Sequence, residues 1–291
     1  MSRPFILCAD DFGLTPGVDA AILDLAAKGR LSAVSGMVTA PAWRADAESL
    51  RRIGNGVELG LHLTLTEFAP LTGSSSLAPG GKPRGPGGLL AAIAARRLGR
   101  DDVGREIARQ IEAFADAVGR RPDYVDGHHH AHQFPLVGAL VVDAIGGGAP
   151  RWRPWLRVCA EPLANIRRRG QGVLDAASAA FLGRRLRRRA EAHGVATNAG
   201  ISGFYDVRKA EAYGAVFPAF FRALGPRHVI VCHPGLCADA AERARPWMAC
   251  REHEYAFLAS PEFAALCARD DVRVATFAEI AAAPPEVSVQ G

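Results

Sequence analysis

Short apolar runs alternate along the chain with longer stretches in which apolar and polar positions follow a helical period. The runs at 4–9, 57–64 and 228–232 end at turn-forming or polar residues, which is typical of buried strands. The stretch 102–118 repeats apolar side chains every three or four residues, which predicts an amphipathic helix. Strand-like and helical segments alternate from end to end, and this order predicts parallel strands joined by right-handed crossovers.

The same patterns place the remaining elements. Thr15 and Pro16 form a typical helix start, with a hydroxyl cap followed by proline in the first turn. Further strands are expected at 33–39, 124–126, 152–159 and 272–275. Further helices are expected at 16–27, 42–52, 89–97, 135–145, 175–193, 207–224, 252–259, 261–268 and 277–283.

Six to eight such units predict an α/β fold, namely an irregular TIM-like (β/α) barrel that forms one domain over residues 1–291. A doubly wound open sheet is the alternative, but no glycine-rich nucleotide loop follows the first strand. Residues 70–88 are rich in Gly, Pro, Ser and Lys, so we expect a mobile loop over the active site. Residues 284–291 are expected to form a loose tail.

Composition narrows the class of protein. The chain has 291 residues, of which 49% are hydrophobic, enough for one sizeable core. No apolar stretch approaches the roughly 20 residues of a transmembrane helix, and the N-terminus carries no targeting pattern. The six cysteines form no CxxC pair, so neither a thiolate zinc site nor a disulfide framework is indicated. The sequence therefore predicts a soluble cytoplasmic protein without a transmembrane segment.

The net charge of +5 comes mostly from arginine, with runs at 167–169 and 184–189. Leu186 interrupts the second run, as in an amphipathic helix, and no aromatic platform or nucleic-acid motif accompanies either run. The runs are therefore interpreted as solvated helix faces rather than as a nucleic-acid site. They leave room for the attraction of small anions such as sugar phosphates.

Candidate chemistry lies where the predicted strands end. Asp10 and Asp11 follow the first strand, His62 lies in the third, and His233 follows the strand at 228–232. Barrel enzymes keep their chemistry at these strand ends. Two imidazoles and one carboxylate can hold a divalent metal and leave positions open for water and substrate. Structural alternatives exist: the Asp pair could cap a helix, and either histidine could serve the core or the strand end.

The histidine cluster is the strongest single signal. Residues 128–132 contain four histidines in five positions, directly after Asp126-Gly127, and packing alone does not explain them. Not all four can be metal ligands. We therefore expect Asp126, His130 and His132 to orient ligands through hydrogen bonds or to contact substrate. One Asp of the pair would bind metal while the other accepts a proton from water, and His233 would act as the general acid.

Four segments together resemble the motifs of the YdjC-type carbohydrate deacetylases. They are residues 9–13 (ADDFG), 60–63 (GLHL), 126–135 (DGHHHAHQFP) and 233–235 (HPG). This family includes chitooligosaccharide deacetylases and hopanoid-biosynthesis-associated proteins. The order and approximate spacing agree from residue 4 to about residue 258, so the resemblance covers most of the chain.

The resemblance implies an irregular TIM-like barrel that binds a divalent metal ion, usually magnesium and in some relatives zinc. It implies hydrolysis of the N-acetyl group of an N-acetylglucosamine-type sugar, on a chitooligosaccharide, a sugar phosphate or a glycolipid. Carried over by position, Asp11, His62 and His128 are the metal ligands. Asp10 matches the proposed base and His233 the proposed acid.

The resemblance also implies a substrate site and an assembly. Residues 200–205 are similar to a Gly/Ser/aromatic turn near the family's substrate, which makes Ser202 and Phe204 candidate substrate contacts. A homodimer is expected by analogy with relatives. The long loop at 70–88 and the arginine-rich segment at 167–189 depart from the chitooligosaccharide-specific members.

Three other functions compete with this interpretation. A metal-dependent amidase acting on a non-sugar amide would need nearly the same residues. A non-haem iron oxygenase uses the same two-histidine, one-carboxylate set, but usually with an H-x-D spacing on a β-sandwich. A non-catalytic sugar-binding module would not need the intact set of Asp10, Asp11 and His233.

Overall fold

The computed structural model describes residues 2–54, 56–147 and 152–283, so the expected tail at 284–291 lies outside the described residues. The strands are β1 (Arg3–Phe12), β2 (Ala33–Gly36), β3 (Glu58–Leu63), β4 (Tyr124–Gly127), β5 (Trp155–Leu156), β6 (Gly200–Ser202), β7 (His228–Cys232) and β8 (Val272–Val274). The α-helices are α1 (Pro16–Ala27), α2 (Trp43–Leu50), α3 (Pro86–Ala94), α4 (Arg100–Val118), α5 (Pro135–Gly146), α6 (Leu163–Arg169), α7 (Val173–Ala192), α8 (Tyr213–Val216), α9 (Ala240–Arg243), α10 (Pro246–Ala259), α11 (Pro261–Arg269) and α12 (Phe277–Ala282). The 3₁₀ turns are η1 (Pro79–Gly81), η2 (His128–Gln133), η3 (Val207–Ala212) and η4 (Phe217–Phe221).

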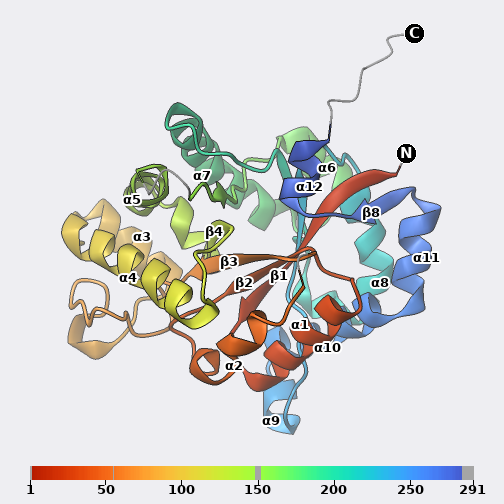
Figure 1. Ribbon diagram of the computed structural model, residues 1–291, viewed down its shortest axis with the longest axis horizontal. Helices are drawn as coiled ribbons and strands as arrows, with labels where there is room; N and C mark the ends of the chain where they lie inside the picture. Colours follow the sequence, from red (N-terminus) through yellow and green to blue (C-terminus); the bar gives the residue numbers. More distant parts are fainter. Residues whose placement is uncertain (1, 55, 148–151, 284–291) are drawn as a thin grey trace.

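The strands pair in the order β5-β4-β3-β2-β1-β7-β6, and β8 joins the first residues of β1. Every described strand pairing is parallel. A parallel bridge between Leu156 and Thr197 connects β5 to the chain just before β6, so the two edges of the sheet meet. The helices surround these central strands (Figure 1). This arrangement confirms the predicted irregular TIM-like α/β barrel, and the meeting of the two edges excludes an open sheet.

The core has two parts because successive strand residues face opposite sides of the sheet. In β1, Phe5 and Leu7 face outward and pack against the surrounding helices. Ile6 and Cys8 face inward and join the smaller cluster inside the barrel. Asp10 continues this inward series by one step. Because successive residues of β1 face opposite sides of the sheet, Asp10 brings a carboxylate to the top of the barrel interior.

Asp11 would point outward if β1 kept its regular alternation. The pairing of β1 with β2 instead shifts register between Ala9 and Phe12, and Asp11 has a φ of 71°. This bulge lets both aspartates reach the same end of the barrel. Neither caps the next helix, because Thr15 does so by accepting a hydrogen bond from the Val18 N–H at 3.2 Å. The predicted start of α1 is thus confirmed.

Two element predictions are wrong, and other elements were not predicted. The single helix expected at 207–224 is broken into η3, α8 and η4, where Pro218 lacks the N–H that a continuous helix would need. The strand expected at 152–159 is only the two residues of β5. The prediction also missed β6 and α6, whose short spans carry little periodicity.

The segment 70–88 lies against α4. The Glu106 carboxylate accepts hydrogen bonds from the backbone of Leu71 and Thr72, at 3.0 and 2.9 Å, and from the Thr72 hydroxyl at 2.7 Å. Leu77 is buried. Of this segment, only Gly85 and Pro86 line the cleft described below. The predicted mobility of this loop stays a prediction.

The arginine-rich helix α7 behaves as its pattern indicates. Leu186 is buried, whereas Arg184, Arg185 and Arg188 are exposed. Among the described residues, no helix is both long enough and apolar enough to cross a membrane. All six cysteines are free thiols.

Candidate active site

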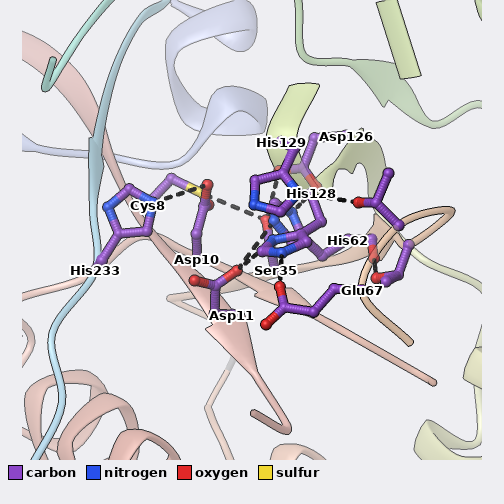
Figure 2. A network of polar contacts seen from close by, with 12 residues as sticks. Cys8, Asp10, Asp11, Ser35, His62, Glu67, Asp126, His128, His129 and His233 are labelled. Carbon is purple, nitrogen blue, oxygen red and sulfur yellow. Dashed lines mark hydrogen bonds and ion pairs between the residues drawn. The ribbon is translucent and has the colours of Figure 1, made fainter. Parts of the chain in front are cut away.

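The carboxyl ends of β1, β3, β4 and β7 meet at one mouth of the barrel, and a cleft of about 750 Å³ opens there. The predicted catalytic and metal-binding side chains gather in this region (Figure 2). The cleft is lined by Asp10, Asp11, Leu14, His62, Glu67, Gly85, Pro86, Gly127, His128, His129, His130, His233, Trp247 and Arg251. Each predicted metal ligand therefore faces this one cleft.

Asp11, His62 and His128 form a compact donor set. His62 Nε2 lies 3.3 Å and His128 Nδ1 lies 3.1 Å from the same atom, Asp11 Oδ1. One ligand atom from each of the three residues lies within 4.8 Å of the other two, and all three side chains are buried. Two imidazole nitrogens and a carboxylate oxygen on one face of the site suit a catalytic divalent metal with open positions. The residues present therefore fit a bound metal ion.

Asp126 holds His62 from behind. Its Oδ1 lies 2.7 Å from His62 Nδ1, and its Oδ2 accepts a hydrogen bond from the Ser35 hydroxyl at 2.6 Å. Asp126 is fully buried, so water does not compete for these contacts. A carboxylate on Nδ1 fixes the proton there and leaves Nε2 free to bind a metal. Asp126 therefore lies where it could orient His62 toward a metal ion, and that role stays a prediction.

Arg157 joins the two parts of the site from inside the barrel. Its guanidinium donates to Asp10 Oδ1 at 2.6 Å and to Oδ2 at 2.7 Å, and it lies 2.9 Å from Asp126 Oδ2. It is fully buried. No motif in the sequence singled out this residue, although a charged side chain inside the apolar run Trp155-Leu156-Arg157-Val158-Cys159 is itself a signal.

Two further residues missed by the sequence analysis contact the donor set. Arg251, on α10, donates to Asp11 Oδ2 at 2.5 Å. Glu67 has a φ of 72° and places its Oε2 2.8 Å from His128 Nε2. Glu67, His128 and His129 form a second cluster of potential metal-ligating atoms. No local pattern in the sequence distinguishes either Glu67 or Arg251 from ordinary surface charges.

The electrostatics of the site favour a bound cation. Burial alone would lower the pKa of His62, but the carboxylates of Asp126 and Asp10 outweigh it and raise the pKa to about 10. Burial likewise opposes the His128 cation, and Asp11 raises the pKa of His128 in spite of it. An environment that attracts protons to two imidazoles attracts a divalent cation for the same reason.

The two aspartates stay ionised although burial opposes their charge. The Arg157 guanidinium and His62 hold the pKa of Asp10 well below its usual range. Arg251 and His128 do the same for Asp11. Asp11 is therefore available as an anionic ligand at neutral pH, and Asp10 as an anionic proton acceptor.

The remaining histidines of the cluster are neutral. Burial and the nearby His128 lower the pKa of His129 to about 4, and its Nδ1 lies 2.9 Å from the Thr66 hydroxyl. Burial and Arg157 lower the pKa of His130 well below its usual range. Burial lowers the pKa of His132 to about 4. His132 Nε2 lies 2.8 Å from the carbonyl oxygen of Arg157, so it supports the segment that carries this guanidinium.

His233 lies on the other side of Asp10 from the donor set (Figure 2). Its Nε2 is 3.9 Å from Asp10 Oδ2, and its side chain is 39% exposed. Its backbone N–H donates to Glu254 Oε2 at 2.6 Å, and Glu254 Oε1 accepts from the Tyr205 hydroxyl at 2.8 Å. The buried carboxylate of Glu254 thereby fixes the position of the His233 backbone.

The two predicted substrate contacts lie apart from the donor set. The Ser202 hydroxyl is buried, donates to the Phe220 carbonyl at 3.2 Å and lies 3.0 Å from His228 Nε2. With Phe204 it lines a separate small pocket. Phe204 approaches the active-site cleft through His130, whose ring centroid is 5.5 Å from its own. A direct substrate contact by either residue stays a prediction.

Together the fold and the site define a class: an irregular α/β barrel with a candidate carboxylate–histidine metal site at the carboxyl ends of its strands. The sequence model of the YdjC-like protein family matches residues 4–269 of this chain. The chain therefore belongs to the YdjC-like family, as its motifs predict.

Curated relatives agree with this assignment, and a solved structure shares the fold. The chain is 34% identical to a human carbohydrate deacetylase over 153 residues, which cover 50% of this chain and 47% of that protein. It is 32% identical to a chitooligosaccharide deacetylase of Escherichia fergusonii over 141 residues, or 48% of this chain and 55% of that protein. The matches thus span about half the length of these curated relatives. A crystal structure of an Enterococcus faecalis protein named for cellobiose-phosphate cleavage has the same fold, with a TM-score of 0.68, 22% identity, and coverage of 96% of this chain and 99% of that one.

Proposed function

We propose that this protein is a metal-dependent hydrolase that removes the N-acetyl group from an N-acetylglucosamine-type sugar, giving acetate and an amino sugar. One observation carries the proposal. The donor set of Asp11, His62 and His128 shares a cleft with an ionised carboxylate, Asp10, and an exposed imidazole, His233. The family and the names of its relatives point to the same chemistry.

The chain supplies a proton acceptor and a proton donor on one wall of the cleft. Asp10 accepts a proton from the attacking water, and Arg157 keeps its carboxylate oriented through two hydrogen bonds. His233 gives a proton to the departing sugar nitrogen as the C–N bond breaks. Asp10 then returns its proton to solvent and His233 regains one. A metal ion on the donor set would polarise the acetyl carbonyl and lower the pKa of water.

The donor chemistry bears on which metal ion binds most tightly. The resemblance implies magnesium, with zinc in some relatives. Two imidazoles and one carboxylate are ligands that zinc binds in catalytic sites, whereas magnesium prefers oxygen ligands. We therefore propose a divalent ion and expect zinc to bind more tightly than magnesium, whichever of them supports turnover. Metal content after purification and reconstitution with each ion decides between them.

Acetate release is the direct test of the proposed reaction. Metal-stripped protein should be inactive on N-acetylglucosamine, its 6-phosphate, diacetylchitobiose and an N-acetylglucosaminyl lipid. Restored metal should give acetate from at least one of them. Release from a simple acetamide but from none of the sugars would favour the non-sugar amidase. Iron-dependent oxygen uptake without acetate would favour the oxygenase, in which Asp10 and His233 would have no role.

The Asp10→Asn variant separates the two aspartates. It should lower kcat by at least about 100-fold, since general base catalysis contributes roughly 10²–10⁴. It should bind metal normally, because Asp10 is outside the donor set. Asp11→Asn should lose the metal. Loss of metal in Asp10→Asn but not in Asp11→Asn would show that their roles are exchanged.

The finer properties of the protein stay proposals. A phosphorylated or lipid-linked sugar is tested by the substrate panel. A homodimer is tested by the molar mass in solution; Leu174 and Phe181, on α7, are the most exposed large apolar side chains among the described residues, at 82% and 75%. A cytoplasmic location is tested by cell fractionation.

A further inference from the structure

One wall of the cleft carries a large aromatic side chain that the proposed reaction does not use. Trp247, in the first turn of α10, lines the cleft together with Asp11 and His233. Its side chain is 42% exposed, whereas Trp43 and Trp155 are each only 4% exposed. Burial of an indole is strongly favourable, so an exposed tryptophan at the mouth of a polar cleft is suited to contact a bound ligand.

Trp247 is also tied to the donor set. The guanidinium carbon of Arg251 lies 5.8 Å from the centroid of its ring, and the same guanidinium donates to Asp11 Oδ2. Arg251 and Trp247 lie four residues apart in α10, so they share one face of the helix. A single buried guanidinium thus separates the indole from the predicted metal ligand. The indole therefore lies next to a side chain that contacts the donor set.

The other residues that line the cleft are of a different kind. Gly85 and Pro86, at the start of α3, come from the segment between β3 and α4, and Glu67 and His129 come from the strand ends. None of them offers a flat apolar surface of comparable size. The indole is the one large aromatic surface among the described residues that line the cleft.

We propose that Trp247 is the stacking platform for a second pyranose ring, next to the sugar whose acetamide reaches Asp10 and Asp11. This inference rests on the proposed function and extends it to the length of the substrate. The C–H face of a pyranose is apolar and carries a weak positive charge, which suits the negative face of an indole. Because Arg251 stands between Trp247 and Asp11, the stacked ring is the neighbour of the reacting sugar. The substrate is accordingly at least a disaccharide.

Kinetics on two sugars test the platform. Wild-type protein should prefer diacetylchitobiose to N-acetylglucosamine by about 10-fold in kcat/KM. Trp247→Ala should bring this ratio close to one, mainly through a higher KM for the disaccharide, and Trp247→Phe should keep part of the preference. Phe181→Ala, which removes an aromatic ring that is 75% exposed on α7, is the matched control and should change neither substrate. Equal losses for both sugars, or an unchanged ratio in Trp247→Ala, would overturn the assignment.

A binding measurement keeps the platform separate from the reaction. In the Asp10→Asn protein, diacetylchitobiose should shield tryptophan fluorescence from quenching by iodide. The shielding should vanish when Trp247→Ala is added, and N-acetylglucosamine should give little of it. Shielding without acetate release by the wild type would support Trp247 as the sugar-stacking residue and contradict the proposed deacetylase activity. Acetate release without Trp247-dependent shielding would support the deacetylase activity and contradict the stacking role of Trp247.

Discussion

Asp126 offers a direct test of how the donor set is held together. Its Oδ1 lies 2.7 Å from His62 Nδ1, and its Oδ2 lies 2.9 Å from a guanidinium nitrogen of Arg157. Asp126→Asn keeps the size of the side chain but replaces one acceptor oxygen with a donor NH₂ group. If that group faces Arg157, two donors meet in a buried site. If it faces His62, the imidazole must move its proton to Nε2, the atom that faces Asp11.

Either orientation weakens the predicted metal site. Loss of a partner that orients a metal ligand typically costs 10–100-fold in affinity. That range corresponds to about 1.4–2.7 kcal/mol of binding free energy. The fold should survive, because Arg157 keeps both of its hydrogen bonds to Asp10.

Calorimetric titration of metal-stripped protein with zinc measures this effect. Asp143→Asn is the matched control, since Asp143 is a half-exposed carboxylate that pairs with Arg189 on the surface. It should bind zinc like the wild type. A thermal melt of each variant checks the fold. If Asp126→Asn is folded and binds zinc with the wild-type Kd, His62 is not a ligand oriented by Asp126, and the reasoning fails.

Two further predictions concern stability. A Cβ at position 60 would lie 2.3 Å from the buried ring of Tyr124, so Gly60→Ala should lower the free energy of unfolding by about 1–3 kcal/mol in urea denaturation. The control Gly54→Ala, which has open space around its Cβ, should change it by no more than about 0.5 kcal/mol. Equal losses of stability in the two variants would contradict this prediction. Burial, despite a hydrogen bond from the Gly13 N–H, raises the pKa of Asp19 to about 8 from 3.8. The folded state therefore keeps a proton that the unfolded chain loses near pH 4, and stability should fall as the pH rises from about 4 to 8. Asp19→Asn should flatten this decline, and an unchanged slope would show that Asp19 is not its source.

Much of the site could be predicted from the sequence because strand ends are a local property. The apolar run of β1 stops at Asp10, β3 carries His62, and His233 directly follows the apolar run of β7. In a parallel barrel all carboxyl ends lie on one side. The order of strands and helices therefore sufficed to predict that the Asp pair, His62 and the histidine cluster would meet, whereas the choice of Asp11 and His128 as ligands came from the family resemblance.

Other features depend on contacts between distant parts of the chain. Arg157 reaches Asp10 across 147 residues, and Arg251 reaches Asp11 across 240. Which guanidinium meets which carboxylate is set by strand register, by barrel closure and by the packing of α10, none of which is written in a local pattern.

The bulge in β1 is another feature that depends on contacts between distant parts of the chain. Regular alternation along β1 would have separated Asp10 and Asp11 on opposite faces of the sheet. The bulge that reunites them exists because β2 pairs with β1 in a shifted register, and Asp11 takes a φ of 71° to follow it. The sequence by itself determined which residue types arrive at the mouth of the barrel, since strand period and strand ends are local. Only the tertiary structure decided which of them touch, because pairing, register and closure bring together segments that the sequence keeps apart.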